Sequence, residues 1–341
     1  MTDKQALSNL IKAQALGLGF DLVGITTLGP AETASAFDEW LSQGFAGEMT
    51  YLPRGAEKRR DTRLPFPGAT SAIVVALNYG GKSPSGPIAR YARGDDYHDV
   101  MWAKLDSLHR WIASQIGRSV SGKAYVDTGP ILERDLARKA GLGWFGKNTN
   151  LINPGIGSFF FIGSLLLDLE LTPDVPFEAD RCGTCTRCLE ACPTQALVAP
   201  RVLDATRCIS YLTIESREAV PEEFRELLGT LVYGCDICQD ACPWNVSFAS
   251  ELTEPALAPR EEMESPSLLD LMRMSPERWR EFSRGSAVKR AKRSGFLRNV
   301  AIALGNAADA DCVPALAEAL SDEEPLVREH AEWGLSRIQS R

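Results

Sequence analysis

The sequence predicts a mixed α/β (α+β) protein in three parts, and three observations support this division. Helical and strand periodicities alternate over residues 1–170, which is typical of a layered α/β domain. Cysteine spacing rather than hydrophobic periodicity organises residues 171–250, and helical periodicity returns over residues 251–341. A chain of 341 residues, 44% of them hydrophobic, is long enough to form two or three domains.

The first part alternates helices with apolar strands. The predicted elements, in order, are helix 2–18, strand 22–25, strand 71–77, helix 98–116, strand 124–126 and a helix from Pro130 to about Gly141. Asp127 directly follows the third strand, a position where α/β proteins commonly place ligand-facing groups. The alternative role of this carboxylate is turn formation or capping of the next helix.

A glycine-rich run over residues 141–148 is similar to two nucleotide-binding motifs, but its context excludes both. The run follows a predicted helix, whereas dinucleotide-binding and P-loop motifs leave a strand and enter a helix. Asn148 also stands where a P-loop needs Ser or Thr to hold magnesium. Gly146, Lys147 and Asn148 remain candidates for contact with a large cofactor, and a simple helix stop at Gly141 is the alternative.

The composition favours a protein without a membrane partner. No basic segment followed by an apolar one opens the chain, and the most apolar run, 159–167, is too short to cross a bilayer. We therefore expect a cytoplasmic protein. The net charge of −8 argues against a general nucleic-acid binder, although residues 284–298 contain six basic residues and no acid. A solvated helix face is the alternative interpretation of this basic segment.

Eight of the nine cysteines fit the interleaved pattern that holds two [4Fe–4S] clusters, seven of them in two runs. The first, C-x2-C-x2-C-x3-C-P from Cys182 to Cys192, has the spacing with which bacterial ferredoxins hold two [4Fe–4S] clusters. The second begins at Cys235 and lacks its first cysteine, because Val232 stands there, so we expect Cys208 to supply the missing ligand. The predicted ligand sets are Cys182, Cys185, Cys188 and Cys242 for one cluster, and Cys192, Cys208, Cys235 and Cys238 for the other.

A pair of zinc sites is the alternative use of such cysteines. Zinc sites do not require the three-cysteine run with a distal Cys-Pro, which occurs here once whole and once truncated, so the pattern favours clusters and about eight iron atoms per chain. Disulfides are disfavoured in the cytosol. Cys312 lies outside both runs, and we expect it to be a small buried apolar residue.

The last part of the chain contains a weak internal repeat. Residues 297–305 resemble residues 327–335 thirty positions later, and Val313–Leu320 supplies a helix between them. This pattern predicts a short stack of HEAT-like helical repeats. The proline-rich segment 251–266 is expected to be a linker.

Several segments together resemble one family, the epoxyqueuosine reductases, which are cobalamin-dependent enzymes that complete queuosine in the tRNA anticodon. These segments are 92–99, 126–130, 140–148, the two cysteine runs with Tyr233–Asp236, and the helical tail. The resemblance spans nearly the whole chain. It implies that residues 1–170 bind cobalamin, that residues 171–250 form a ferredoxin-like domain with two [4Fe–4S] clusters, and that residues 251–341 help to grip tRNA.

The reaction implied by this resemblance is reduction of epoxyqueuosine to queuosine at the wobble position of tRNA, which takes two electrons and two protons and releases water. The clusters would relay electrons from an external low-potential donor to cob(I)alamin. The resemblance places the acid that protonates the epoxide oxygen at Asp127.

The resemblance also implies further contacts. The cofactor contacts expected are Tyr97, His98, Asp127, Gly146, Lys147 and Asn148. Although Asp96–His98 begins like the D-x-H-x-x-G motif of proteins that ligate cobalt, Met101 replaces its glycine, so we expect base-off cobalamin with no histidine on the metal. The residues expected to contact tRNA phosphates are Lys289, Arg290, Lys292, Arg293 and Arg298. We expect a monomer.

Two other functions stay open at this point. Reductive dehalogenases also couple a corrinoid to two clusters, but they usually carry an export signal and lack a helical-repeat tail. A non-catalytic ferredoxin-type protein would pass electrons to a partner, but an α/β domain of about 170 residues is larger than such a relay requires.

Overall fold

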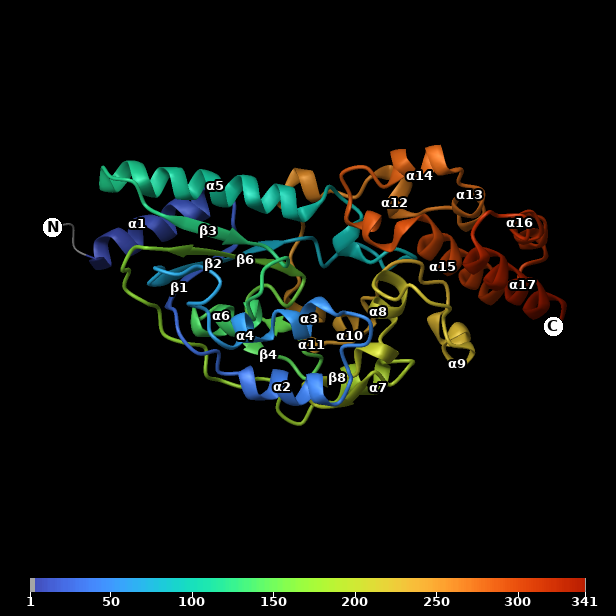
Figure 1. The fold of residues 1–341 in the computed structure, drawn as a ribbon, viewed down its shortest axis with the longest axis horizontal. Helices are drawn as coiled ribbons and strands as arrows, with labels where there is room; N and C mark the ends of the chain where they lie inside the picture. Colours follow the sequence, from blue (N-terminus) through green and yellow to red (C-terminus); the bar gives the residue numbers. More distant parts are fainter. Residues whose placement is uncertain (1–3, 341) are drawn as a thin grey trace.

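A four-stranded sheet lies at the centre of the first part of the computed structural model, which describes residues 4–340 (Figure 1). The strand order is β1-β2-β6-β3, and every neighbouring pair is antiparallel. The strands are β1 (Leu22–Thr27), β2 (Ser71–Asn78), β3 (Gly122–Tyr125) and β6 (Phe160–Leu167). The domain is therefore of the α+β kind, with a sheet that brings the end of β3 next to β6.

Helices cover both faces of this sheet. The helices α1 (Lys4–Gly17) and α5 (Tyr97–Ile116) lie on one face, and α6 (Glu133–Lys139) lies on the other (Figure 1). Alternate residues of β2 join different cores, since Ile73 packs with the α1 and α5 side and Val74 with the α6 side. Burial on both faces explains why β2 is a continuous apolar run in the sequence.

Most predicted elements of this part are confirmed, and one boundary is wrong. The helix predicted over 98–116 is α5, and the strands predicted over 22–25 and 71–77 are β1 and β2. The helix expected from Pro130 begins only at Glu133. The reason is a tight turn after β3, in which the Thr128 N–H donates to the Val126 carbonyl at 2.6 Å, so the chain completes this turn before it enters the helix.

Shorter elements complete the first and second parts. In the first part they are α2 (Ala34–Ser42), α3 (Tyr51–Arg54), α4 (Ala56–Arg60), η1 (Arg90–Ala92), β4 (Trp144–Phe145) and β5 (Leu151–Ile152). In the cysteine-bearing part they are α7 (Arg187–Ala191), β7 (Leu197–Ala199), β8 (Val202–Leu203), η2 (Ala205–Arg207), α8 (Ile209–Ile214), α9 (Glu222–Arg225), η3 (Glu226–Leu228), α10 (Ile237–Asp240) and α11 (Pro243–Phe248).

The C-terminal part is helical, as predicted. Its elements are η4 (Pro255–Leu257), α12 (Glu261–Glu264), α13 (Leu268–Met272), α14 (Pro276–Phe282), η5 (Ala287–Ala291), α15 (Lys292–Ala307), η6 (Ala310–Cys312), α16 (Val313–Ala319) and α17 (Pro325–Gln339). The helices α15 and α17 approach closely, because a Cβ atom on Gly305 would lie 2.7 Å from the Cα atom of Gly334. Their assignment to the HEAT class stays a prediction.

The segment expected to be a linker, residues 251–266, is instead packed against the first part. Leu257 and Met263 are buried in the main core, and the Arg260 N–H donates to the Arg93 carbonyl at 2.9 Å. The prolines and acids of this segment suggested a linker. They interrupt helices, but they do not prevent its apolar side chains from packing in the core. None of the described helices combines the length and the apolar character that crossing a bilayer requires.

Candidate functional site

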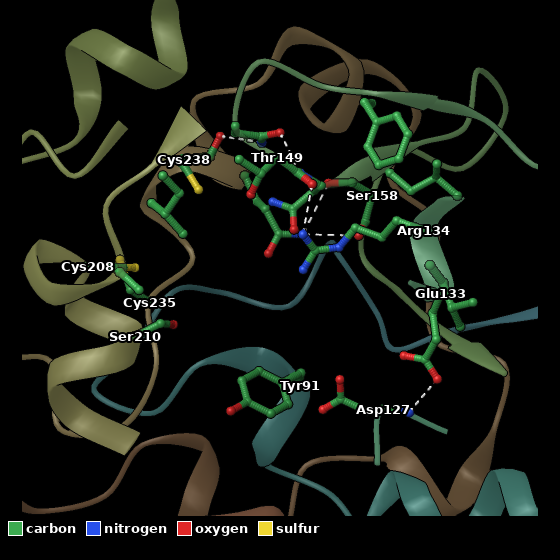
Figure 2. Close-up of a pocket in the computed structure, with 18 of the residues that line it drawn as sticks. Tyr91, Asp127, Glu133, Arg134, Thr149, Ser158, Cys208, Ser210, Cys235 and Cys238 are labelled. Atoms are coloured by element: carbon green, nitrogen blue, oxygen red, sulfur yellow. Dashed lines mark hydrogen bonds between the residues drawn. The ribbon is translucent and has the colours of Figure 1, made fainter. Parts of the chain in front are cut away.

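A cavity of about 710 Å³ opens between the sheet and the cysteine-bearing part. Figure 2 shows Asp127 and Glu133 on one side of it and Cys208, Cys235 and Cys238 on the other. The cavity lies within the range of small-molecule sites, which is about 300–1,000 Å³. A cofactor held here would lie between cysteine side chains on one side and two carboxyl groups on the other.

Asp127 has a conformation that its side chain disfavours. Its φ angle is 58°, in the left-handed region that costs a non-glycine residue about 1–3 kcal/mol. Two contacts hold it: the Tyr97 hydroxyl donates to Oδ2 at 2.8 Å, and its own backbone N–H donates to Oε1 of Glu133 at 2.7 Å. Strain held in place by neighbouring groups is common at active sites, and the role predicted for Asp127 is compatible with it.

Tyr97, the first residue of α5, is fixed as a hydrogen-bond donor. Its ring stacks on Phe161 with centroids 4.0 Å apart and planes 3° apart. Burial, followed by the neighbouring Asp127 carboxylate, raises the pKa of Tyr97 far above its usual value. The phenol therefore stays protonated throughout the physiological pH range, and its O–H donates a hydrogen bond to Asp127.

Glu133 is the most strongly perturbed carboxyl in the cavity. Burial, with the charge of Asp127 as the second cause, raises the pKa of Glu133 to about 8. Glu133 does not stand out in the sequence, because acids are common in the first turn of a helix, where the helix dipole stabilises negative charge. Tyr91 lines the same cavity, and it too carries no local motif that marks it in the sequence.

The seven cysteines of the two runs and Cys208 line two cavities, four in each. Cys182, Cys185, Cys188 and Cys242 line a smaller cavity of about 160 Å³, and Cys192, Cys208, Cys235 and Cys238 line the large one. This is the grouping that the spacing predicts, and the assignment of ligands to each cluster stays a prediction. The donor set fits iron–sulfur clusters, since four cysteines line each space.

Three thiols of the second set, those of Cys208, Cys235 and Cys238, are partly buried in the wall of the large cavity. Burial raises the pKa of the Cys235 thiol to about 12, and it also raises the pKa of Cys208 and Cys238. Such thiols ionise only when a metal supplies compensating positive charge. Their burial therefore suits a cluster and does not suit a free reactive cysteine.

Lys147 and Asn148 connect the glycine-rich loop to the clusters. The Lys147 ammonium donates to the carbonyls of Gly183 at 2.7 Å and Cys185 at 2.9 Å, so Lys147 lines the smaller cavity and not the large one. Asn148 lines both cavities, and its side-chain amide donates to the Cys238 carbonyl at 3.3 Å. The described lining of the large cavity does not include Lys147, and its contact with a cofactor stays a prediction.

Two further expected contacts, His98 and Gly146, lie next to residues that line the cavity but do not line it themselves. His98 is turned toward Asp96, with 2.6 Å between Nδ1 and Oδ1, because Asp96 caps the N-terminus of α5 and draws the ring to itself. Neither His98 nor Gly146 is among the described residues that line the large cavity. A Cβ atom at Gly146 would lie 2.6 Å from the Asn148 side chain, so this glycine lets the loop close on itself.

The basic segment 284–298 divides into exposed and buried residues. Lys289, Arg290 and Lys292 are exposed, and Arg293 is partly buried against Asp322 at 2.7 Å. The prediction that Arg298 contacts tRNA is wrong, because its side chain is 0% exposed. Its guanidinium donates instead to carbonyls of the segment that follows α8, including those of Ser216 and Glu218.

Arg290 connects this basic segment to the mouth of the large cavity. Its guanidinium lies 5.7 Å from the centre of the Tyr51 ring and makes two hydrogen bonds, of 2.9 and 2.7 Å, to Glu215. Tyr51 is 41% exposed and lines the cavity. A nucleic acid bound along the exposed basic residues would therefore reach the cavity opening.

Two family models match the chain in the regions that the site occupies. Residues 59–128 match a model described as epoxyqueuosine reductase QueG, DUF1730, and residues 181–245 match a model described as a 4Fe-4S double cluster binding domain. The second match decides against the zinc alternative. The cysteine-bearing part is therefore a domain that binds two [4Fe–4S] clusters.

Curated relatives match almost the whole chain. An epoxyqueuosine reductase of Salmonella typhimurium is 42% identical over 98% of this chain and 89% of its own length. One of Escherichia coli is 40% identical over 98% of this chain and 90% of its own length.

Solved structures give the same match. A selenomethionine-labelled epoxyqueuosine reductase superposes with a TM-score of 0.89 at 33% identity, and covers 98% of this chain and 91% of its own. A second structure, with a tRNA-Tyr stem loop carrying epoxyqueuosine, has a TM-score of 0.88 at 33% identity and the same coverage. A third, from Bacillus subtilis at 32% identity and a TM-score of 0.88, is described with a catalytic aspartate loop swung out of its active site.

Proposed function

Because the chain belongs to the epoxyqueuosine reductase family, we propose that it reduces epoxyqueuosine to queuosine at the wobble position of tRNA. The observation that supports this proposal is that one cavity is lined by the cysteines expected to hold a cluster and, opposite them, by the Asp127 carboxylate. Cys208 and its set supply electrons from one wall, and Asp127 supplies a proton from the other (Figure 2). Neither a reductive dehalogenase nor a simple electron carrier accounts for relatives of this name over the whole chain.

We propose cobalamin as the cofactor of the large cavity, bound base-off and without a histidine ligand. The cavity fits such a group, since aromatic side chains such as Tyr91 and Phe161 line it together with polar ones. Bound cobalamin would supply a strongly reducing cobalt centre able to open the epoxide. Of the contacts expected from sequence, Tyr97, Asp127 and Asn148 line this cavity and remain in the proposal.

The residues of the chain would orient the substrate and handle its protons. Asp127 would protonate the epoxide oxygen while Tyr97 holds Oδ2 and fixes the carboxyl group in place. A catalytic aspartate loop that moves in the Bacillus subtilis structure supports this role, since Asp127 also stands in a strained loop. The eight cysteines would hold the two clusters in the sets given above and relay electrons from an external low-potential donor.

Substrate tRNA would lie along the exposed basic residues. A relative binds an epoxyqueuosine-modified stem loop, and Lys289, Arg290 and Lys292 offer phosphate contacts beside the cavity mouth. Arg293 joins them through its partly exposed guanidinium. Phosphate contacts would position the anticodon, and the wobble nucleotide would turn out into the cavity.

The proposal includes the organisation of the whole protein. Residues 1–170 would bind cobalamin, residues 171–250 would hold the clusters, and residues 251–341 would contribute a HEAT-like region to tRNA binding. We propose that the protein acts as a monomer in the cytoplasm, where its tRNA substrate is found.

The decisive experiment is anaerobic incubation of cobalamin-loaded protein with a strong reductant and epoxyqueuosine-containing tRNA. We expect nucleoside mass spectrometry to show the loss of one oxygen atom from the modified base. An unchanged nucleoside would contradict the proposed function. The same reaction without cobalamin is the control.

An Asp127→Asn variant tests the acid within this reaction. The amide keeps the size and the hydrogen bond from Tyr97 but cannot give up a proton to the epoxide, so turnover should fall about 10²- to 10⁴-fold. Iron content and tRNA binding should stay at the level of the unmodified protein. A variant with full turnover would remove Asp127 from the mechanism and leave the function standing.

A further inference from the structure

The proposed reaction consumes two protons, and Asp127 accounts for one of them. Removal of an epoxide oxygen as water breaks two C–O bonds, forms one C=C bond and takes up two electrons and two protons. The two electrons come from the external donor through the clusters. Cobalamin and tRNA bound in the cavity would displace bulk water, so the second proton would need a source among the residues that line it.

We propose that Glu133 supplies this second proton, by passing it to the Asp127 carboxylate. The two residues lie on the same side of the cavity, and Oε1 of Glu133 accepts the Asp127 backbone N–H at 2.7 Å (Figure 2). Tyr97 donates to Oδ2 of Asp127 at 2.8 Å and so stabilises the carboxylate that the first transfer leaves. The inference rests on the proposed function and concerns the same site.

The other acids among the described residues that line the cavity are already engaged. The Asp135 carboxylate accepts the backbone N–H groups of Glu32 and Thr33, at 3.3 and 3.0 Å, which ties α6 to the start of α2. The Asp236 carboxylate accepts the backbone N–H of Arg90 at 2.9 Å and its guanidinium at 3.0 Å. Glu133 is thus the lining acid whose hydrogen-bond partner is Asp127 itself.

The surroundings of Glu133 keep its carboxyl protonated near neutral pH. Burial is the main cause, and the Asp127 carboxylate is the second; together they raise its pKa to about 8. The guanidinium groups of Arg134 and Arg59 act in the opposite direction and are outweighed. Arg134 is drawn away by its hydrogen bond to the Thr149 carbonyl at 3.0 Å.

The proton steps balance as follows. Asp127 gives its proton to the epoxide oxygen as the two electrons relayed by the clusters break the first C–O bond; this leaves a hydroxyl group on one carbon, the electron pair on the other and the Asp127 carboxylate. The Glu133 carboxyl then protonates Asp127, which delivers that proton to the hydroxyl as the electron pair forms the C=C bond, the second C–O bond breaks and water leaves. Glu133 ends as a carboxylate and recovers its proton from solvent.

A Glu133→Gln variant separates proton supply from positioning. Glutamine keeps a carbonyl oxygen that accepts the Asp127 N–H, so the loop retains its hydrogen bond while the titratable proton is removed. We expect turnover at pH 7 to fall about 10²-fold. In the unmodified protein turnover should decline as pH rises through about 8, where Glu133 loses its proton, and this decline should be absent from the variant.

Asp135→Asn is the matched control on the same helix. Its carboxylate binds backbone amides, so the variant should lower the melting temperature and leave the alkaline decline of turnover in place. Wild-type turnover and an unchanged alkaline decline in Glu133→Gln would overturn the proposal.

Infrared spectroscopy of the cofactor-free protein gives a readout that does not depend on activity. The carbonyl stretch of a protonated carboxylic acid should be present at pH 7, disappear above about pH 8 and be missing from Glu133→Gln. If the unmodified protein failed to reduce its tRNA, the proposed function would fail, whereas this signal would still report on Glu133. A Glu133 that is ionised at pH 7 would overturn the inference in either case.

Discussion

At the scale of single residues, two cysteines of the chain form a matched pair for testing the clusters. Cys208 lines the large cavity with three other cysteines, whereas Cys312 is buried in the C-terminal core away from both cavities. Cys208→Ser should lower the iron content from about eight to about four atoms per chain and abolish turnover. Cys312→Ser should keep all of its iron. Iron and sulfide assays on anaerobically purified protein measure both, and full iron in Cys208→Ser would disprove its role as a ligand.

A single residue's role can be predicted from sequence only where it depends on residues nearby in the chain. The cysteine spacing is local, which is why the cysteines of each cavity could be grouped from sequence. The position of Asp127 after a strand left capping and turn formation open, and only the family resemblance marked it as the proposed acid. Arg298 could not be interpreted correctly, because its carbonyl partners Ser216 and Glu218 lie 82 and 80 positions earlier in the chain. Glu133 carried no signal, since its pKa depends on burial that only the folded cavity provides.

At the scale of elements, the turn η5 and the start of α15 form the exposed basic edge beside the cavity mouth. A triple variant that changes Lys289, Arg290 and Lys292 to Gln should weaken tRNA binding and reduce its salt dependence. The slope of log Kd against log salt should decrease by about 0.7–0.9 for each phosphate that the variant no longer neutralises. Binding measured over a series of salt concentrations tests this expectation.

The control for that variant lies on the neighbouring helix α14. Arg278 and Arg280 are also exposed arginines, and they form surface ion pairs with Glu262 and Glu277. Changing both to Gln alters the net charge without touching the edge beside the cavity, so tRNA affinity should change little. Equal weakening by both variants would mean that only net charge matters and that the basic edge has no specific role.

The sheet shows which features of an element the sequence carries. Periodicity identified β1, β2 and α5, because burial determines the spacing of apolar residues. It contained no information on strand direction, and the alternation of helices and strands did not reveal that β2 pairs antiparallel with both β1 and β6. That pairing depends on contacts between residues about 50 to 90 positions apart, which no local pattern encodes.

At the scale of the whole molecule, the C-terminal helices and the cluster region form one packed body. The main core contains residues from Leu7 of α1 to Ala331 of α17. The helix α15 lies at the junction, where the Asn299 side-chain amide donates to the carbonyls of Thr213 at 2.9 Å and Val232 at 2.8 Å. The region proposed to hold tRNA is thus fixed directly to the region that holds the clusters, and this rigid attachment would keep a bound anticodon at the cavity mouth.

His330 makes this junction sensitive to acid. It is 0% exposed, the Val220 N–H donates to its Nε2 at 3.2 Å, and its Nδ1 therefore carries the hydrogen that is donated to the Leu326 carbonyl at 2.7 Å. Burial lowers the pKa of His330 to about 4. An unfolded histidine has a pKa of about 6.5. Between about pH 6.5 and 4, His330 is therefore protonated in the unfolded chain but stays neutral in the folded protein.

Stability should consequently fall as pH drops from about 6.5 toward 4, by up to about 3 kcal/mol from this residue, because one pKa unit corresponds to about 1.4 kcal/mol. His330→Gln keeps an acceptor and a donor but does not titrate, so its free energy of unfolding should depend less on pH over this interval. Anaerobic urea unfolding at pH 7, 6 and 5 measures the difference. His109→Gln, on the first domain, is the control and should follow the unmodified protein. Parallel pH curves for His330→Gln and the unmodified protein would show that protonation of His330 does not govern the acid stability of the junction.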